Sequence, residues 1–266
     1  MIWGDVLTYF AFRTRTARTI ASIGAAFLIG LSRSAPSQAQ DALSSAERCL
    51  SANFNVSLGA QLPRTAARLK SGQPLKIVAI GSSSTVGLWQ LRSAATYPEV
   101  MRRELSRLRS NATIKVINSG RVGDTIPNNI ARFQRDVFAY TPDLVIWQLG
   151  TNDVAWGGRP DEALKRSVFE GVRALKAAPS DVVLMDMQYA PQVLASAGYS
   201  TMEEDIVDVA KQERVGLFSR FALMRNSISA GVAQSALVTF DGLHNTADGY
   251  DCIGRALARA ISTSAR

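Results

Sequence analysis

The stretch LKIVAIGSSSTVG, residues 75–87, decides the fold. Residues 75–80 form an apolar run, typical of a strand that is buried on both faces. The run ends abruptly in Gly81 and a row of serines, residues 82–84. Parallel α/β sheets bind ligands beyond the carboxyl ends of their strands. A serine turn at this point can therefore present a hydroxyl group to a ligand.

Similar apolar runs recur along the chain and alternate with amphipathic stretches. Strands are expected at residues 75–80, 113–118, 144–149, 182–187 and 215–218. Helices are expected near residues 41–52, 97–109, 128–140, 161–177, 202–213 and 247–261. Strands that alternate with helices are typical of a parallel sheet with helices on both faces. The sequence therefore predicts an α/β fold with three layers, α/β/α.

Residues 1–39 differ from the rest of the chain. Three arginines, Arg13, Arg15 and Arg18, precede a 12-residue apolar run at residues 20–31, and Ser37-Gln38-Ala39 follows as a small-x-small cleavage signal. This order is typical of a secretory signal peptide, and the apolar run is shorter than the roughly 20 residues of a membrane-spanning helix. We expect residues 1–39 to be a signal peptide and residues 40–266 to form one domain. An uncleaved anchor is the alternative.

The composition of the 266 residues is that of a globular protein, with 47% hydrophobic and 20% charged residues. Residues 1–39 hold four Arg and one Asp, so +5 of the net charge of +8 belongs to residues 40–266. The basic residues are dispersed and are not interleaved with aromatic ones. Binding of nucleic acid is therefore not expected. After cleavage, no stable membrane span is expected either.

The two cysteines, Cys49 and Cys252, lie near the two ends of the predicted domain. An even number of cysteines in an exported protein favours a disulfide. Two separately buried thiols are the alternative. With one histidine and two distant cysteines, a zinc site is not expected.

The single histidine, His244, follows an aspartate in Asp241-Gly242-Leu243-His244. Together with a serine of the turn at residues 82–84, these residues supply a nucleophile, a base and an acid that orients the base. Two other interpretations stay open on these residues alone. A serine of the turn can cap a helix, and a lone histidine can have no catalytic role.

Two further loops follow predicted strands and contain glycine and asparagine. They are Asn-Ser-Gly-Arg-Val-Gly-Asp-Thr at residues 118–125 and Gly-Thr-Asn-Asp at residues 150–153. With the serine turn and Asp241-x-x-His244, these loops resemble the four sequence blocks of the SGNH, or GDSL-type, esterase and lipase superfamily. The resemblance covers about residues 75–260. Each block alone is a weak signal, but four in the right order and spacing are a strong one.

This resemblance implies a flavodoxin-like parallel sheet, the SGNH hydrolase fold, and assigns a role to each block. Ser83 matches the nucleophile, His244 the base and Asp241 the orienting acid. The backbone N–H groups of Ser83 and Gly123 and the side-chain amide of Asn152 match the oxyanion hole. Such an enzyme forms an acyl-enzyme on the serine and is expected to use no cofactor and no metal ion.

One block departs from the superfamily pattern. The first block usually reads Gly-Asp-Ser, whereas this chain has Gly81-Ser82-Ser83. Because Asp241 fills the acid position, Ser82 does not remove catalysis, but we expect it to change how the loop is braced. The Gly-x-Ser-x-Gly elbow of the α/β-hydrolases is also missing, since Thr85 stands at the second glycine position.

Three aromatic residues follow predicted site loops or strands and are candidate substrate contacts: Trp89, Trp156 and Tyr189. Aromatic rings beside a site can stack on sugar rings or contact an acyl chain, and packing beneath loops is the alternative.

The combined features predict a secreted or periplasmic serine ester hydrolase. The expected substrate is an ester, either an acylated carbohydrate or a lipid, and the favoured reaction removes O-acetyl or other short acyl groups from a carbohydrate or envelope polymer. A lipid or aryl esterase, a thioesterase, or an acyltransferase of the same fold are alternatives. An inert SGNH domain that binds glycan or envelope is an alternative of another class.

Overall fold

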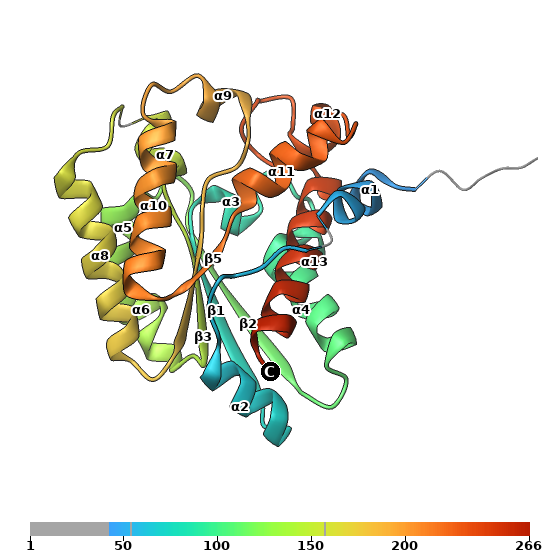
Figure 1. The fold of residues 1–266 in the computed structure, drawn as a ribbon, viewed down its shortest axis with the longest axis vertical. Helices are drawn as coiled ribbons and strands as arrows, with labels where there is room; N and C mark the ends of the chain where they lie inside the picture. The colour runs from blue at the N-terminus through green and yellow to red at the C-terminus, as the bar shows by residue number, and fades with distance from the viewer. Residues whose placement is uncertain (1–42, 54, 157) are drawn as a thin grey trace, which may run out of the picture. The chain divides into compact units, whose positions relative to one another are not determined.

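The computed structural model describes residues 43–53, 55–156 and 158–266, and its centre is a parallel sheet (Figure 1). The five strands lie in the order β2-β1-β3-β4-β5, which is the flavodoxin-like order. Their bounds are β1 Leu75–Gly81, β2 Ile114–Gly120, β3 Leu144–Gln148, β4 Asp181–Met185 and β5 Gly216–Phe218. The predicted fold class is confirmed. The signal peptide expected at residues 1–39 lies outside the described residues.

The apolar runs form strands because both faces of the sheet are buried. Successive side chains of a strand point to opposite faces. In β1, Ile77 and Ala79 therefore pack into one hydrophobic cluster, whereas Val78 and Ile80 pack into the other. A strand of this kind has no polar face, which explains why β1 is apolar apart from Lys76 near its start.

Two sets of helices cover these faces (Figure 1). One face carries α1 Ser45–Ala52, α4 Tyr97–Leu108 and α13 Ala247–Ser264, and the other carries α5 Ile126–Ala131, α8 Glu162–Ala177 and α10 Tyr199–Glu213. The remaining elements are α2 Pro63–Ser71, α3 Ser83–Val86, η1 Ser93–Ala95, α6 Phe133–Asp136, η2 Phe138–Tyr140, α7 Thr151–Ala155, α9 Pro191–Leu194, α11 Arg220–Ser229 and α12 Gln234–Leu237. Within the described ranges, no helix has both the length and the apolar character needed to cross a bilayer.

One expectation about helices was wrong, and some helices were not expected. The helix expected at residues 128–140 is divided into α5, α6 and η2, with breaks at Arg132 and Val137. Arg132 is buried, and its guanidinium binds backbone carbonyls and carboxylates, including Gly81 O at 2.9 Å and Asp136 Oδ2 at 3.0 Å. These polar contacts are not visible in an amphipathic pattern. Helix α11, between β5 and the last helix, was not expected at all.

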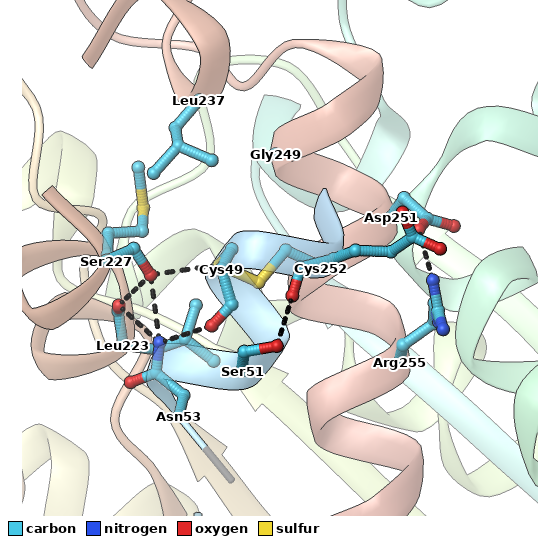
Figure 2. Close-up of a disulfide and its surroundings, with 12 residues drawn as sticks. Cys49, Ser51, Asn53, Leu223, Ser227, Leu237, Gly249, Asp251, Cys252 and Arg255 are labelled. Atoms are coloured by element: carbon cyan, nitrogen blue, oxygen red, sulfur yellow. Dashed lines mark hydrogen bonds and ion pairs between the residues drawn. A yellow bond between two sulfur atoms is a disulfide. The ribbon is translucent and has the colours of Figure 1, made fainter. Parts of the chain in front are cut away.

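A disulfide joins α1 to α13, as the export signal and the two cysteines predicted (Figure 2). Cys49 and Cys252 are fully buried, and their Cα atoms lie 6.0 Å apart across a sequence separation of 203 residues. Asn53 holds the end of α1 beside it, since its side-chain amide donates to Cys49 O at 2.8 Å and to Leu223 O at 3.1 Å. The short first helix is therefore attached to both α11 and α13.

Replacing both cysteines by serine should lower the stability of the domain. A cross-link over a loop of this length contributes about 4–5 kcal/mol in the chain-entropy model, because it restricts the unfolded chain. Urea unfolding of the Cys49→Ser/Cys252→Ser variant should show a lower midpoint than the oxidised wild type. Reducing agent should lower the midpoint of the wild type only, and equal midpoints for variant and wild type would contradict the prediction.

Candidate active site

Four segments meet at the carboxyl edge of the sheet, whose five strands run in parallel. Ser83 follows β1, Gly123 follows β2 and Asn152 follows β3. Asp241 and His244 come from the segment between α12 and α13. The chain thus brings residues that are far apart in sequence to one edge, where such sheets bind ligands.

Ser83 is the first residue of α3, a single helical turn that starts directly after β1. Two glycines allow this turn to pack closely against the sheet. A Cβ atom on Gly81 would lie 2.4 Å from Thr85 Oγ1, and one on Gly120 would lie 2.3 Å from the Val86 nitrogen. Larger residues at either position would displace the turn. The serine is consequently held on a short, tightly packed element.

The side chain of Gln148, on the neighbouring strand β3, also holds the turn. Its Oε1 accepts hydrogen bonds from the Ser82 backbone N–H at 2.9 Å, the Ser82 hydroxyl at 2.9 Å and the Thr85 hydroxyl at 3.1 Å. A backbone N–H can only donate, so the amide oxygen and not the nitrogen must face Ser82. Gln148, Ser82 and Thr85 are all buried. Their contact fixes the position of the turn that carries Ser83.

Ser83, His244 and Asp241 form a continuous hydrogen-bonded chain. Ser83 Oγ lies 2.8 Å from His244 Nε2, and His244 Nδ1 lies 2.7 Å from Asp241 Oδ2. A carboxylate accepts only, so Nδ1 carries the proton and Nε2 is free to accept the proton of the serine hydroxyl. Ser83 is 5% exposed and His244 is 8% exposed. The structure therefore brings together the three residues expected from the sequence.

Asp241 is held as an anion by several donors. Its Oδ1 accepts from the Thr239 hydroxyl at 2.7 Å and from the backbone N–H groups of Leu243 at 2.9 Å and His244 at 3.0 Å. Burial alone would raise the pKa of Asp241, but the hydrogen bonds from Thr239, the His244 ring and the two amides outweigh it and hold the pKa well below its ordinary value. A charged Asp241 keeps the imidazole in the orientation described above.

The predicted oxyanion donors also lie on these loops. The backbone N–H groups of Ser83 and Gly123 have no acceptor among the residues that the structure describes. Gly123 has a φ of +81°, in the region that favours glycine. Asn152 is buried, and its amide nitrogen donates one hydrogen bond to Asp124 O at 2.9 Å, which leaves its second N–H for another acceptor. Their action on a substrate stays a prediction.

A family model describes almost the whole chain and matches residues 31–266. The chain belongs to the non-GDSL lipase-like family. This family is lipase-like, which agrees with the esterase and lipase resemblance of the sequence. The match supports that general class and does not by itself show the SGNH superfamily. At the position of the usual aspartate in the first block, this chain has Ser82, whose hydroxyl binds Gln148.

Comparisons with single proteins agree with this family. An arylesterase of Vibrio mimicus is 26% identical over 187 residues, which are 70% of this chain and 88% of the relative. Among solved structures, a two-domain esterase active on acetylated mannans is 20% identical, with a TM-score of 0.68 over 80% of this chain and 56% of that one. An acetyl xylan esterase of Geobacillus stearothermophilus is 21% identical, with a TM-score of 0.59 over 70% and 94%.

The two solved structures show that the fold is shared. This member of the non-GDSL lipase-like family spans only 56% of the chain of the mannan esterase.

Acidic residues on the loops after β2 and β3 brace the candidate site. Asp124 Oδ2 accepts from Asn129 at 2.9 Å and pairs with Arg132. Asp153 Oδ1 accepts from the Ile126 backbone N–H at 3.0 Å, and burial raises the pKa of this carboxyl. Both side chains are thus bound to neighbouring elements.

The three aromatic candidates lie in different environments. Trp89 and Trp156 are exposed, and the Trp89 indole N–H donates to Asp241 Oδ2 at 2.7 Å. Tyr189 is partly buried and packs edge-on against Phe221 with ring centroids 5.1 Å apart. The ring of Tyr189 therefore takes part in packing, and substrate contact by any of the three stays a prediction.

A buried arginine beneath the site was not found by sequence reasoning. Arg220 is 0% exposed and begins α11, directly after β5. It donates to Gln188 Oε1 at 2.7 Å, and Gln188 in turn donates to Leu243 O at 3.0 Å. Thr151 also donates to Gln188, at 2.9 Å. The cluster therefore links the loops after β3, β4 and β5 to the segment that carries His244. Its position after a strand was the only available sequence signal.

Two carboxyl groups lie beside this arginine. Asp186 is fully buried, accepts from the Phe221 backbone N–H at 2.9 Å and lies within hydrogen-bonding reach of Glu203. Burial, together with the neighbouring Asp186, raises the pKa of Glu203 to about 9. The pair therefore holds a proton at neutral pH, and that proton can bridge the two carboxyl groups.

Replacing Glu203 by glutamine should change how stability depends on pH. Between about pH 4.5 and 9 the folded wild type holds a proton on Glu203 that the unfolded chain releases, so its free energy of unfolding falls as pH rises. One such proton gives a slope of up to about 1.4 kcal/mol per pH unit. The Glu203→Gln variant should show a shallower fall, measured by urea unfolding at several pH values.

Glu204→Gln is the matched control because Glu204 is the next residue and is exposed. It should keep the slope of the wild type. Identical slopes for the Glu203 variant and the wild type would refute the shared proton.

Proposed function

We propose that this protein is a serine ester hydrolase of the SGNH type, with Ser83 as nucleophile, His244 as base and Asp241 as orienting acid. The observation that carries the proposal is the chain of two short hydrogen bonds, 2.8 Å from Ser83 Oγ to His244 Nε2 and 2.7 Å from His244 Nδ1 to Asp241 Oδ2. A serine hydroxyl needs a base at about this distance to become nucleophilic.

The reaction follows from this geometry in two steps. Ser83 Oγ attacks the carbonyl carbon of the ester while its proton passes to His244 Nε2, and the oxyanion accepts hydrogen bonds from the N–H groups of Ser83, Gly123 and Asn152. His244 then returns the proton to the leaving alcohol oxygen, and an acyl-Ser83 ester remains. Water then attacks the carbonyl carbon of this ester and gives a proton to Nε2. The bond from that carbon to Ser83 Oγ breaks, His244 returns the proton to Oγ, and the acid leaves.

The proposed substrate is an acetylated or similarly short-acylated carbohydrate. Structural neighbours named as an esterase active on acetylated mannans and an acetyl xylan esterase support an ester of this kind, and the relative named as an arylesterase supports ester hydrolysis in general. Exposed aromatic side chains at the edge of the site, Trp89, Trp156 and Phe240, suit the faces of sugar rings. Lipid esters, aryl esters and thioesters are the alternatives, and so is transfer of the acyl group to a hydroxyl.

We further propose that the protein is exported, with residues 1–39 as a cleaved signal peptide and residues 40–266 as the mature SGNH domain. The disulfide supports this location because such bonds persist in oxidising compartments outside the cytosol. The periplasm and the exterior of the cell are both oxidising, so the disulfide fits either destination.

A Ser83→Ala variant should lose hydrolysis of every ester that the wild type cleaves, because no other group supplies the attacking oxygen. The test is a panel that runs from 4-nitrophenyl acetate through longer acyl chains to acetylated xylo-oligosaccharides. Acetylated sugars should be the best substrates of the wild type. A fluorophosphonate should label the wild type and not Ser83→Ala, and failure to label the wild type would favour an inert binding domain.

An Asn152→Ala variant tests the oxyanion hole separately from the nucleophile. Losing one such donor should lower kcat about 100- to 1000-fold, since it acts on charge that develops in the transition state. Steady-state kinetics on 4-nitrophenyl acetate measure this effect, and KM should change little. A variant with unchanged kcat would remove Asn152 from the proposed oxyanion hole.

A further inference from the structure

The loop that follows the nucleophile turn contacts the segment of the proposed base and acid at two points. The Trp89 indole N–H donates to Asp241 Oδ2 at 2.7 Å, and the Gln90 side-chain amide donates to Asn245 O at 3.1 Å. Asp241 and Asn245 flank the segment that contains His244. The loop from Gly87 to Gln90 therefore links the element that carries Ser83 to the element that carries His244.

Trp89 binds the same oxygen of Asp241 that the imidazole of His244 binds. Asp241 Oδ2 accepts from both Trp89 Nε1 and His244 Nδ1, each at 2.7 Å, whereas Oδ1 accepts from Thr239 and from the backbone. Because two donors share Oδ2, the direction in which this oxygen points depends on Trp89 as well as on His244.

The backbone of Trp89 is held in an unusual conformation. Its φ is +70°, a region that bulky residues other than glycine rarely adopt. Such a conformation persists where surrounding contacts impose it, and it is found preferentially at functional sites. The backbone N–H of Gln90 donates to Gly87 O at 2.9 Å, which closes this turn. The turn thus directs the indole N–H toward Asp241.

The same ring is open to solvent on its other side. Trp89 is 54% exposed, and Phe240, the residue before Asp241, is 89% exposed. Their ring centroids lie 5.6 Å apart with a 53° angle between the planes. Two large apolar rings that remain exposed beside a site are typical of a binding surface. Their faces suit the C–H face of a sugar ring, with which aromatic side chains stack.

We propose that Trp89 has two roles, as the positioning residue that orients Asp241 through its indole N–H, and as one half of a sugar-stacking surface whose other half is Phe240. The second role rests on the proposed carbohydrate esterase function, and the first does not. A sugar ring bound on this surface would contact the side chain that hydrogen-bonds to the proposed acid. Trp89 therefore takes part both in substrate binding and in the orientation of the imidazole.

Trp89→Phe is the decisive variant, because it removes the N–H donor and keeps an aromatic ring, although a smaller one. We expect kcat on 4-nitrophenyl acetate to fall about ten-fold, as for loss of one hydrogen bond to a charged group, with KM for this small ester unchanged. Phe240→Ala keeps the donor and should raise KM for acetylated xylo-oligosaccharides more than KM for 4-nitrophenyl acetate. Leu91→Ala, at the fully exposed position directly after this loop, is the control and should match the wild type.

The single histidine gives a readout that does not need activity. In the proton NMR spectrum, the Nδ1–H of His244 should give one low-field resonance, and Trp89→Phe should shift it because a competing donor to Oδ2 is gone. A Trp89→Phe protein with an unchanged resonance and an unchanged rate of fluorophosphonate labelling would overturn the positioning role. A wild type that is labelled but cleaves neither ester would refute the proposed hydrolysis, and the resonance would still decide the role of Trp89.

Discussion

The contact on which the site depends is the one between Gln148 Oε1 and the turn that begins at Ser82. One buried oxygen on β3 receives three donors from the start of α3. Without it, the Ser82 N–H would be buried without an acceptor, at a cost of about 1–3 kcal/mol. The position of Ser83 relative to the sheet is therefore set by a side chain of the neighbouring strand. An aspartate in place of Ser82 would put a carboxylate against Gln148 Oε1, and two acceptors cannot form a hydrogen bond with each other. This gives a physical reason for serine at this position.

The sheet could be predicted because its strands appear as largely apolar runs. The candidate catalytic residues could be predicted because four short blocks, three of them after strands, together resemble the SGNH superfamily. The remaining features depend on contacts between distant segments. The expected helix at residues 128–140 is interrupted at Arg132, a buried side chain that binds Gly81 O and Asp136. Trp89 and Asp241 are 152 residues apart in the sequence, and no pattern in either segment predicts their contact.

The candidate site is held from two sides. Beneath it, Arg220 and Gln188 connect the ends of β3, β4 and β5 to the segment of His244. At its rim, Trp89 and Gln90 connect the nucleophile loop to the same segment. The contacts of Arg220 and Gln188 are buried, where a low dielectric makes hydrogen bonds strong and costly to break. The segment that carries the imidazole consequently has little freedom to move away from Ser83, although it contains no long helix of its own.

The bond between Cys49 and Cys252 turns nearly the whole described domain into one covalent ring. Exposed loops are the points at which proteases cut folded proteins. A single cut anywhere between these two residues would leave both fragments attached to each other. The nicked molecule would keep its pieces at high local concentration, so the packed sheet could survive damage that would separate the parts of an unbridged chain.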